Sequence, residues 1–212
     1  FKQEQMRVAN KYYKKLKHNF KWIISLDVDE FITTKLNITN TIKDELNTTF
    51  KDVDCIKIPW ILMGFKNQQN YPKNILVENT FRMNYDNIHK KVSSNFKFRN
   101  RDNKIECKCI FKPIFFDKIS VKNNRATDHY PLIDPNFSNI IINDSIENKI
   151  TKLNTFYENL NELKIKNSFL LCYHYRINSI EHIQDKIKNN LWYKQFDIND
   201  IVKSDISEIE DT

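Results

Sequence analysis

The segment Trp22–Phe31, with the sequence WIISLDVDEF, constrains the fold of this chain more than any other stretch. Its apolar residues at 22, 23, 24 and 26 predict a β-strand covered on both faces, as the strands of α/β sheets are. Asp27 and Asp29 follow where such a strand should leave the sheet, and open α/β sheets bind ligands at the carboxyl ends of their strands. The pattern therefore predicts an α/β fold with acidic side chains at one edge of its sheet.

Asp27 and Asp29 are two residues apart, so on a strand both side chains would point to the same side. Two neighbouring carboxylates repel each other, and a hard cation such as Mg²⁺ or Mn²⁺ relieves that repulsion while bridging to substrate phosphates. We therefore expect a metal site that handles a phosphorylated substrate. Histidine also binds Mn²⁺, and His129 and His174 are the candidates for a third ligand, with one of the two expected to serve.

The chain has 212 residues and a single glycine, Gly64. Phosphate-binding loops of the Walker, dinucleotide and kinase types all need several glycines, so none of them can be present. A bound phosphate would have to be held by metal, by Lys or Arg side chains and by helix N-termini. This increases the importance of the two aspartates.

The composition is typical of a folded chain, and the sequence has no apolar run long enough to span a membrane. Hydrophobic residues make up 40% of it, which is enough for a sizeable core, and no apolar run reaches 18 residues. The net charge of +7 fits either a lysine-rich composition set by codon usage or attraction of an anionic ligand. The four cysteines form no zinc motif and are expected to be free, buried thiols.

Hydrophobic periodicity and capping signals predict the order of elements. One domain, 1–212, is expected, with a possible helical insertion at 136–166. We also expect an irregular segment at 122–140 and an acidic tail that frays from Asp205 onward. Helices are predicted over 3–18, 40–48 and 145–165 and from Ser179, and further strands over 53–62, 75–83, 92–98, 104–111, 113–121 and 169–175.

Short motifs lie along the chain in a definite order. They are Leu26–Phe31, Ile58-Pro59-Trp60 with Met63-Gly64, Lys108–Pro113, His129-Tyr130-Pro131, and His174-Tyr175-Arg176 with Ser179, Glu181 and Lys186. Together they resemble the family 2-like and family 92 glycosyltransferases, in which the first motif reads DVDEF. No single motif is specific, so the resemblance rests on the ordered set.

The resemblance implies a GT-A-like mixed sheet flanked by helices. It also implies transfer of a sugar from a nucleotide-sugar donor to a hydroxyl of a glycan, protein or lipid acceptor, with Mn²⁺ or Mg²⁺ as cofactor. Asp27 and Asp29 would hold the metal against the diphosphate of the donor, and Glu30 would orient them. His129 is slightly favoured over His174, because it follows the strand that returns to the metal in such folds.

The sequence leaves the roles of several further residues open. Arg176 and Lys186 could pair with phosphate oxygens or lie on a helix surface, and Trp60 could stack on a sugar or belong to the core. Gly64 belongs to the motif that follows Trp60 and is a further candidate for substrate binding. An inverting enzyme would need a carboxylate base, and the sequence does not choose among Glu78, Asp86, Glu106 and Asp128.

Only 26 residues precede Asp27, fewer than the nucleotide-binding half of a GT-A fold requires. We therefore expect a fragment of a longer chain that lacks part of this half. One alternative is an aspartate-nucleophile phosphohydrolase, but it expects Thr or Val in place of Phe31 and a later Gly-Asp pair. Another is a basic nucleic-acid-binding module, which would need no metal. We regard nucleic acid as the less favoured partner.

Overall fold

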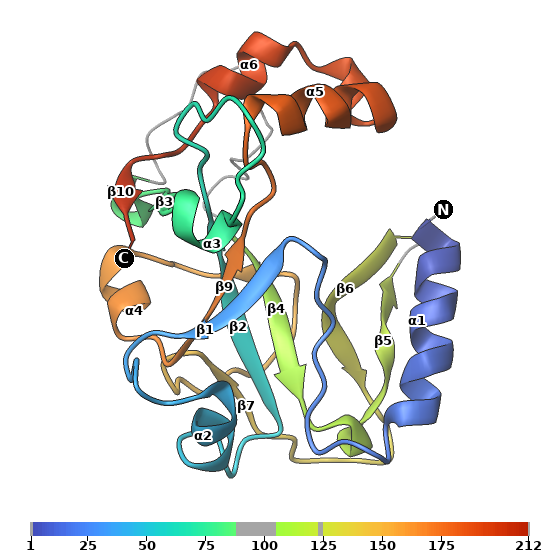
Figure 1. Cartoon of the computed structure of the whole chain (residues 1–212). Coiled ribbons are helices and arrows are strands. Elements are labelled where there is room, and N and C mark those ends of the chain that lie inside the picture. Colours follow the sequence, from blue (N-terminus) through green and yellow to red (C-terminus); the bar gives the residue numbers. More distant parts are fainter. Residues whose placement is uncertain (1, 88–104, 123–124, 212) are drawn as a thin grey trace. The chain divides into compact units, whose positions relative to one another are not determined.

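The structure is a computed structural model that describes residues 2–87, 105–122 and 125–211. It is mixed α/β (Figure 1) and divides into two compact units, which are described separately. No helix in these three ranges is both long and apolar enough to cross a membrane. The first unit comprises Phe1–Trp60, Ile105–Glu158 and Leu163–Cys172, and the second comprises Ile61–Lys104, Asn159–Glu162 and Tyr173–Thr212.

A mixed sheet forms the centre of the first unit. Its strands follow the order β1 (Glu30–Thr34), β9 (Leu170–His174), β2 (Cys55–Leu62), β4 (Ile105–Phe111) and β8 (Phe156–Tyr157), and β7 (Ile142–Asp144) pairs with β2. β2 runs parallel to β7 and antiparallel to β4. Because β2 lies between β9 and β4, Pro59 belongs to an interior strand, although proline in a sheet is usually confined to edge strands or bulges.

Helix α1 (Lys2–Leu16) packs on a two-stranded ribbon of β5 (Phe116–Lys122) and β6 (Arg125–Ile133) (Figure 1). The hydroxyl of Tyr13 lies 2.8 Å from the carbonyl oxygens of Pro113 and Phe116, to which it can donate. The helix predicted over 3–18 is confirmed. The irregular segment predicted at 122–140 is confirmed for 134–140 but wrong for Arg125–Ile133, where pairing with β5 makes a strand of residues that show little strand propensity.

The strand predicted over Trp22–Phe31 is wrong for most of its length. Ile23 makes an isolated antiparallel bridge to Phe111 of β4, and β1 begins only at Glu30. β9 and β2 separate β1 from β4 in the sheet, so residues 24–29 must cross from one strand to the other and cannot join a ladder.

The amphipathic helix predicted over 145–165 does not form. The carboxylate of Asp144 accepts the backbone N–H groups of Ile146 (3.0 Å) and Asn148 (2.8 Å), which closes a turn where the helix was expected to begin. Such side-chain-to-backbone bonds compete with helix formation. The segment follows β7 directly and contains β8 and most of the short helix α4 (Glu162–Lys166).

Two other predicted helices are confirmed, and the one that begins after Ser179 was predicted from its cap. Thr41 and Asp44 form a capping box at the start of α2 (Ile42–Asn47). In the second unit, Ser179 Oγ accepts the N–H of His182 at 3.0 Å and caps α5 (Ile180–Asn189). That unit also contains α3 (Ile75–Glu78), β3 (Phe81–Arg82), α6 (Ile198–Lys203), β10 (Ile209–Glu210) and short 3₁₀ helices at Tyr85–Asn87 and Tyr193–Gln195. A further 3₁₀ helix, Pro113–Phe115, lies in the first unit.

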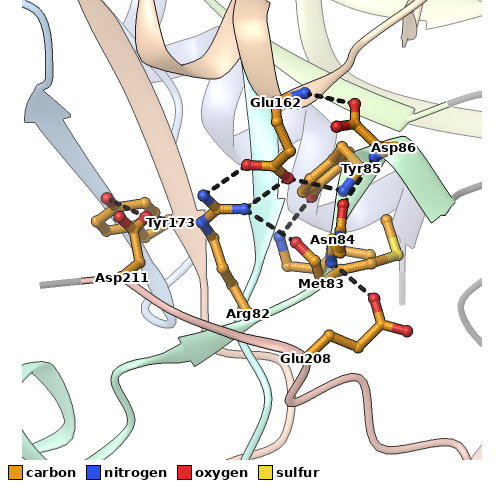
Figure 2. A network of polar contacts seen from close by, with 10 residues as sticks. Arg82, Met83, Asn84, Tyr85, Asp86, Glu162, Tyr173, Glu208 and Asp211 are labelled. Atoms are coloured by element: carbon orange, nitrogen blue, oxygen red, sulfur yellow. Dashed lines mark hydrogen bonds and ion pairs between the residues drawn. The ribbon is translucent and has the colours of Figure 1, made fainter.

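The predicted strand over 75–83 becomes α3 and the two-residue strand β3, and the one over 92–98 lies outside the described residues. β3 pairs antiparallel with β10, so the acidic tail does not fray as expected. Figure 2 shows the reason: buried Arg82 binds both carboxylate oxygens of Glu162 at 2.8 Å and the carboxylate of Asp211 at 2.9 Å. Two carboxylates thus neutralise one buried guanidinium and hold the tail in place.

Candidate functional site

Asp27, Val28 and Asp29 form a tight turn that leads into β1. The N–H of Glu30 donates to the carbonyl oxygen of Asp27 at 3.1 Å, and the N–H of Asp27 donates to the carboxylate of Glu30 at 2.9 Å. These two bonds close the turn from both ends, and Val28 at its tip is fully exposed. The acidic pair therefore lies on a turn before a strand, and not at the end of one as the sequence predicted.

Lys108, in the middle of β4, brings a buried positive charge to this turn. Its Nζ lies 3.1 Å from Glu30 Oε2 and 3.7 Å from Asp27 Oδ2. The side chains of Lys108 and Glu30 are fully buried, whereas 48% of the Asp27 side chain is exposed. A buried ammonium is costly unless an anion compensates it. Glu30 supplies that anion, and Asp27 keeps access to solvent.

The carboxylate of Glu30 has a raised pKa. Its pKa is raised to about 7, chiefly by burial and also by the charge of Asp27, although the Lys108 ammonium and the N–H of Asp27 lower it. Its Oε1 is buried and has no hydrogen-bond partner within residues 2–87, 105–122 and 125–211. The protonation of Glu30 and its pairing with Lys108 and Asp27 therefore depend on any further charge that binds beside these side chains.

Trp60 and His129 continue the cluster. Lys108 Nζ lies 5.7 Å from the centre of the Trp60 ring, and that ring packs edge to face against His129 with centroids 5.0 Å apart. His129 Nδ1 lies 2.8 Å from the carbonyl oxygen of Cys107. A carbonyl can only accept, so Nδ1 carries the proton in the neutral ring and Nε2 keeps its lone pair. Trp60 is buried, which favours the core alternative for this residue.

Four predicted site residues are embedded in the packing of the second unit. His174 is buried at the end of β9. The guanidinium of Arg176 lies 4.9 Å from the centre of the Trp192 ring, and Lys186 Nζ donates to the carbonyl of Arg176. A Cβ on Gly64 would lie 2.2 Å from Ser207 Oγ, so this glycine allows close approach of the C-terminal segment.

The candidate bases have distinct environments. The carboxylate of Glu78 accepts the N–H of Asn74 and the amide of Gln68, and these bonds hold its pKa below the usual value. Asp86 accepts the N–H of Glu162 at 3.1 Å (Figure 2). Glu106 lies on β4 two residues before Lys108, on the same face of that strand. Asp128 belongs to β6, and its side chain lies outside the described residues.

Reasoning from sequence assigned Lys108 no role beyond membership of a motif. A signal was available, because Lys108 is a charged residue in the middle of the apolar strand sequence IECKCIF. A lysine in a fully buried strand position is costly unless a polar or oppositely charged group pairs with it. Glu30, in contrast, was expected to orient its neighbours, and its bond to the N–H of Asp27 has that effect on the turn.

Comparison with known proteins assigns no family: no protein-family model matches the chain, and no curated protein matches it significantly. Within the described ranges, no three or more His, Cys, Asp or Glu side chains lie close enough together to form a metal-binding group. The cluster that the structure does assemble is therefore characterised by its own geometry, with Lys108 at its centre.

Proposed function

We propose that this chain carries the catalytic site of a metal-dependent glycosyltransferase, which moves a sugar from a nucleotide-sugar donor to an acceptor hydroxyl. The observation that carries the proposal is the convergence of separate motifs. Four motifs of the resemblance contribute residues to one chain of contacts within the first unit. These residues are Asp27 and Glu30 from the first motif, Trp60 from the second, Lys108 from the third and His129 from the fourth. Residues up to about a hundred positions apart are thus neighbours around one ion cluster.

The donor chemistry at the turn fits a hard divalent cation. Asp27 and Asp29 offer carboxylate oxygens, and neither side chain is fully buried. The ammonium of Lys108 lies closer to Glu30 than to Asp27, so Glu30 can balance the lysine charge while Asp27 binds a cation. When bound, Mn²⁺ or Mg²⁺ would supply Lewis-acid stabilisation of the leaving diphosphate.

The residues of the chain contribute orientation and charge. Glu30 holds the N–H of Asp27 and so keeps the turn in one conformation. Lys108 keeps a fixed positive charge beside Asp27, and fixed charges in a buried site stabilise developing negative charge more than mobile ones do. In this role Lys108 would stabilise the negative charge that develops on the leaving diphosphate, without binding the metal.

Binding of Mn²⁺, with and without a nucleoside diphosphate, tests the proposal by calorimetry and by the electron paramagnetic resonance of the ion. Asp27→Asn and Asp29→Asn should each weaken Mn²⁺ binding by about tenfold or more, because each removes one anionic ligand. Asp52→Asn is the matched control, since its side chain is exposed and contacts only the exposed Lys51 among the described residues. Equal Mn²⁺ affinity in all three variants would contradict the metal site.

Turnover provides a second readout. The wild-type chain should release nucleoside diphosphate from at least one sugar nucleotide in the presence of Mn²⁺, and Asp29→Asn should abolish the release. Tight, metal-independent binding of RNA or DNA instead would favour a basic nucleic-acid-binding module.

A further inference from the structure

A second buried lysine, Lys57, lies on the opposite face of the sheet from Lys108. In the antiparallel pairing of β2 with β4, Lys57 is opposite Cys109 and Ile58 is opposite Lys108. Side chains alternate between the two faces along a strand, and directly paired residues share a face. Lys57 therefore faces away from the ion cluster of Lys108 and belongs to a different site.

The two lysines differ in how their charge is compensated. Lys57 is only 4% exposed, and its Nζ donates to the neutral amide oxygen Asn154 Oδ1 at 2.8 Å. That oxygen also accepts the N–H of Phe156 at 2.9 Å. In the part of the chain that the structure describes, Lys57 forms no ion pair, whereas Lys108 has two carboxylates. A buried ammonium with only a neutral partner is a costly arrangement that an added anion would relieve.

A pocket of about 260 Å³ opens beside Lys57. Its wall includes Asp144, which is directly paired with Lys57 in the parallel pairing of β2 with β7. Asp144 forms no ion pair with Lys57 within the described ranges, and its carboxylate accepts the N–H groups of Ile146 and Asn148 and the side-chain amide of Asn148. The ammonium has three donors, and one of them is used by Asn154.

We propose that this pocket binds a small hydroxylated organic acid, whose oxyanion, a carboxylate or a phosphate, pairs with Lys57. Lys152 adds a second cation to the wall. The hydroxyl of Thr151 and the carboxylate of Glu158 offer a donor and acceptors for hydroxyl groups of the same ligand. A sugar acid has this combination of groups and is of a size that a pocket of this volume can hold.

The test compares ligands that differ in charge alone. D-Glucuronate and D-glucose share their ring hydroxyls and differ by a carboxylate, and inorganic phosphate serves as a second oxyanion. We expect calorimetry or ligand-observed NMR to detect glucuronate at millimolar concentrations, with glucose at least about tenfold weaker because it cannot pair with the ammonium. Phosphate should compete with glucuronate.

Variants of the wall identify the site. Lys57→Met should weaken glucuronate binding by about tenfold or more, and Lys51→Met, at an exposed lysine outside the pocket, should leave it unchanged. The melting temperature of Lys57→Met should equal or exceed that of the wild type, because methionine removes a buried charge. If this variant does not fold, Thr151→Trp, which narrows the pocket from its exposed wall, should give the same loss of binding.

The outcomes that overturn the proposal are clear. Equal affinity for glucose and glucuronate would show that charge is not recognised. Undiminished binding in Lys57→Met or Thr151→Trp would place the ligand elsewhere, and absence of binding of both glucuronate and phosphate would leave the pocket without this function. Asp27→Asn should not alter glucuronate binding, so failure of this proposal is distinguishable from failure of the glycosyltransferase proposal.

Discussion

At the scale of single residues, Lys108 is the side chain on which the candidate site most depends. Its ammonium is the common neighbour of Glu30 and Asp27 and lies near the Trp60 ring. One buried cation therefore connects the turn that carries the acidic motif with the middle of the sheet. Three predictions belong at this scale.

Lys108→Met should lower the free energy of unfolding by about 3 kcal/mol, because it leaves the buried carboxylate of Glu30 without its cation. Urea denaturation measures the change, with Lys51→Met, an exposed lysine, expected to stay within about 0.5 kcal/mol of the wild type. The double variant Lys108→Met/Glu30→Gln should regain part of the loss. An unchanged midpoint in Lys108→Met would contradict the role of this ion pair.

Glu30 should make stability depend on pH. Burial raises its pKa from 4.5 to about 7, so the folded chain keeps a proton that the unfolded chain releases. The resulting stabilisation is complete below about pH 4.5 and is lost as the pH rises through 7. In metal-free buffer, the free energy of unfolding of the wild type relative to Glu30→Gln should therefore fall by about 1–3 kcal/mol between pH 5 and pH 8. A constant difference over this range would contradict the prediction.

Gly64→Ala should destabilise the second unit although the position has no strained backbone angle. The added Cβ would lie 2.2 Å from Ser207 Oγ and 2.9 Å from the backbone N of Ser207, so the C-terminal segment must shift. We expect a loss of about 1–3 kcal/mol in urea denaturation, as for overpacked sites. Ser207→Gly in the same chain removes the closer contact and should recover only part, since the backbone contact remains.

At the scale of elements, the helix that begins after Ser179 was predicted from its local start signal, whereas the one predicted over 145–165 does not form. Thr41 begins α2 through a capping box, and Ser179 begins α5 through its bond to the N–H of His182. Such signals are contained within four residues of sequence, so they do not depend on the rest of the fold. The segment at 145–165 failed for a related reason, because Asp144 stabilises a competing turn at its start.

Ser179→Ala tests the cap of α5. The hydroxyl is fully buried and accepts one of the free N–H groups at the start of the helix, so its loss should cost about 1–2 kcal/mol of stability. Ser179→Asp keeps an acceptor at the same position and should lose less. If the Ser179→Ala and Ser179→Asp variants were equally stable, the hydrogen bond from the His182 N–H would contribute little to stability. Another reason for a serine at this position would then be needed.

At the scale of the whole molecule, contacts between distant segments decide which parts of the chain are ordered. Asp211, near the C-terminus, and Glu162 both bind Arg82, although 129 and 80 residues separate them from it in sequence. The bidentate contact with Glu162 and the pairing of β10 with β3 hold these segments within the second unit. No local pattern predicts such pairing, which is why the tail was expected to fray.

Deleting residues 209–212 should remove about 3 kcal/mol of stability, because Arg82 loses one of its two carboxylates and β3 loses its partner strand. Hydrogen exchange followed by mass spectrometry should show the loss in peptides that contain Arg82. Glu210→Gln is the control for charge in the tail, since the side chain of Glu210 is exposed and does not contact Arg82. A deletion variant as stable as the wild type would contradict the anchoring role of Asp211.

The sequence by itself determined the α/β class, the strands at β2, β4 and β9, and the helix capped by Ser179. These follow from patterns within a few residues, where side-chain periodicity and capping bonds act locally. Only the tertiary structure decided that residues 24–29 cross the sheet, that Lys108 supplies the cation beside Asp27 and Glu30, and that Lys57 faces a pocket on the other side. These features depend on strand order and on which charges are buried together, and both arise from contacts between residues far apart in the chain.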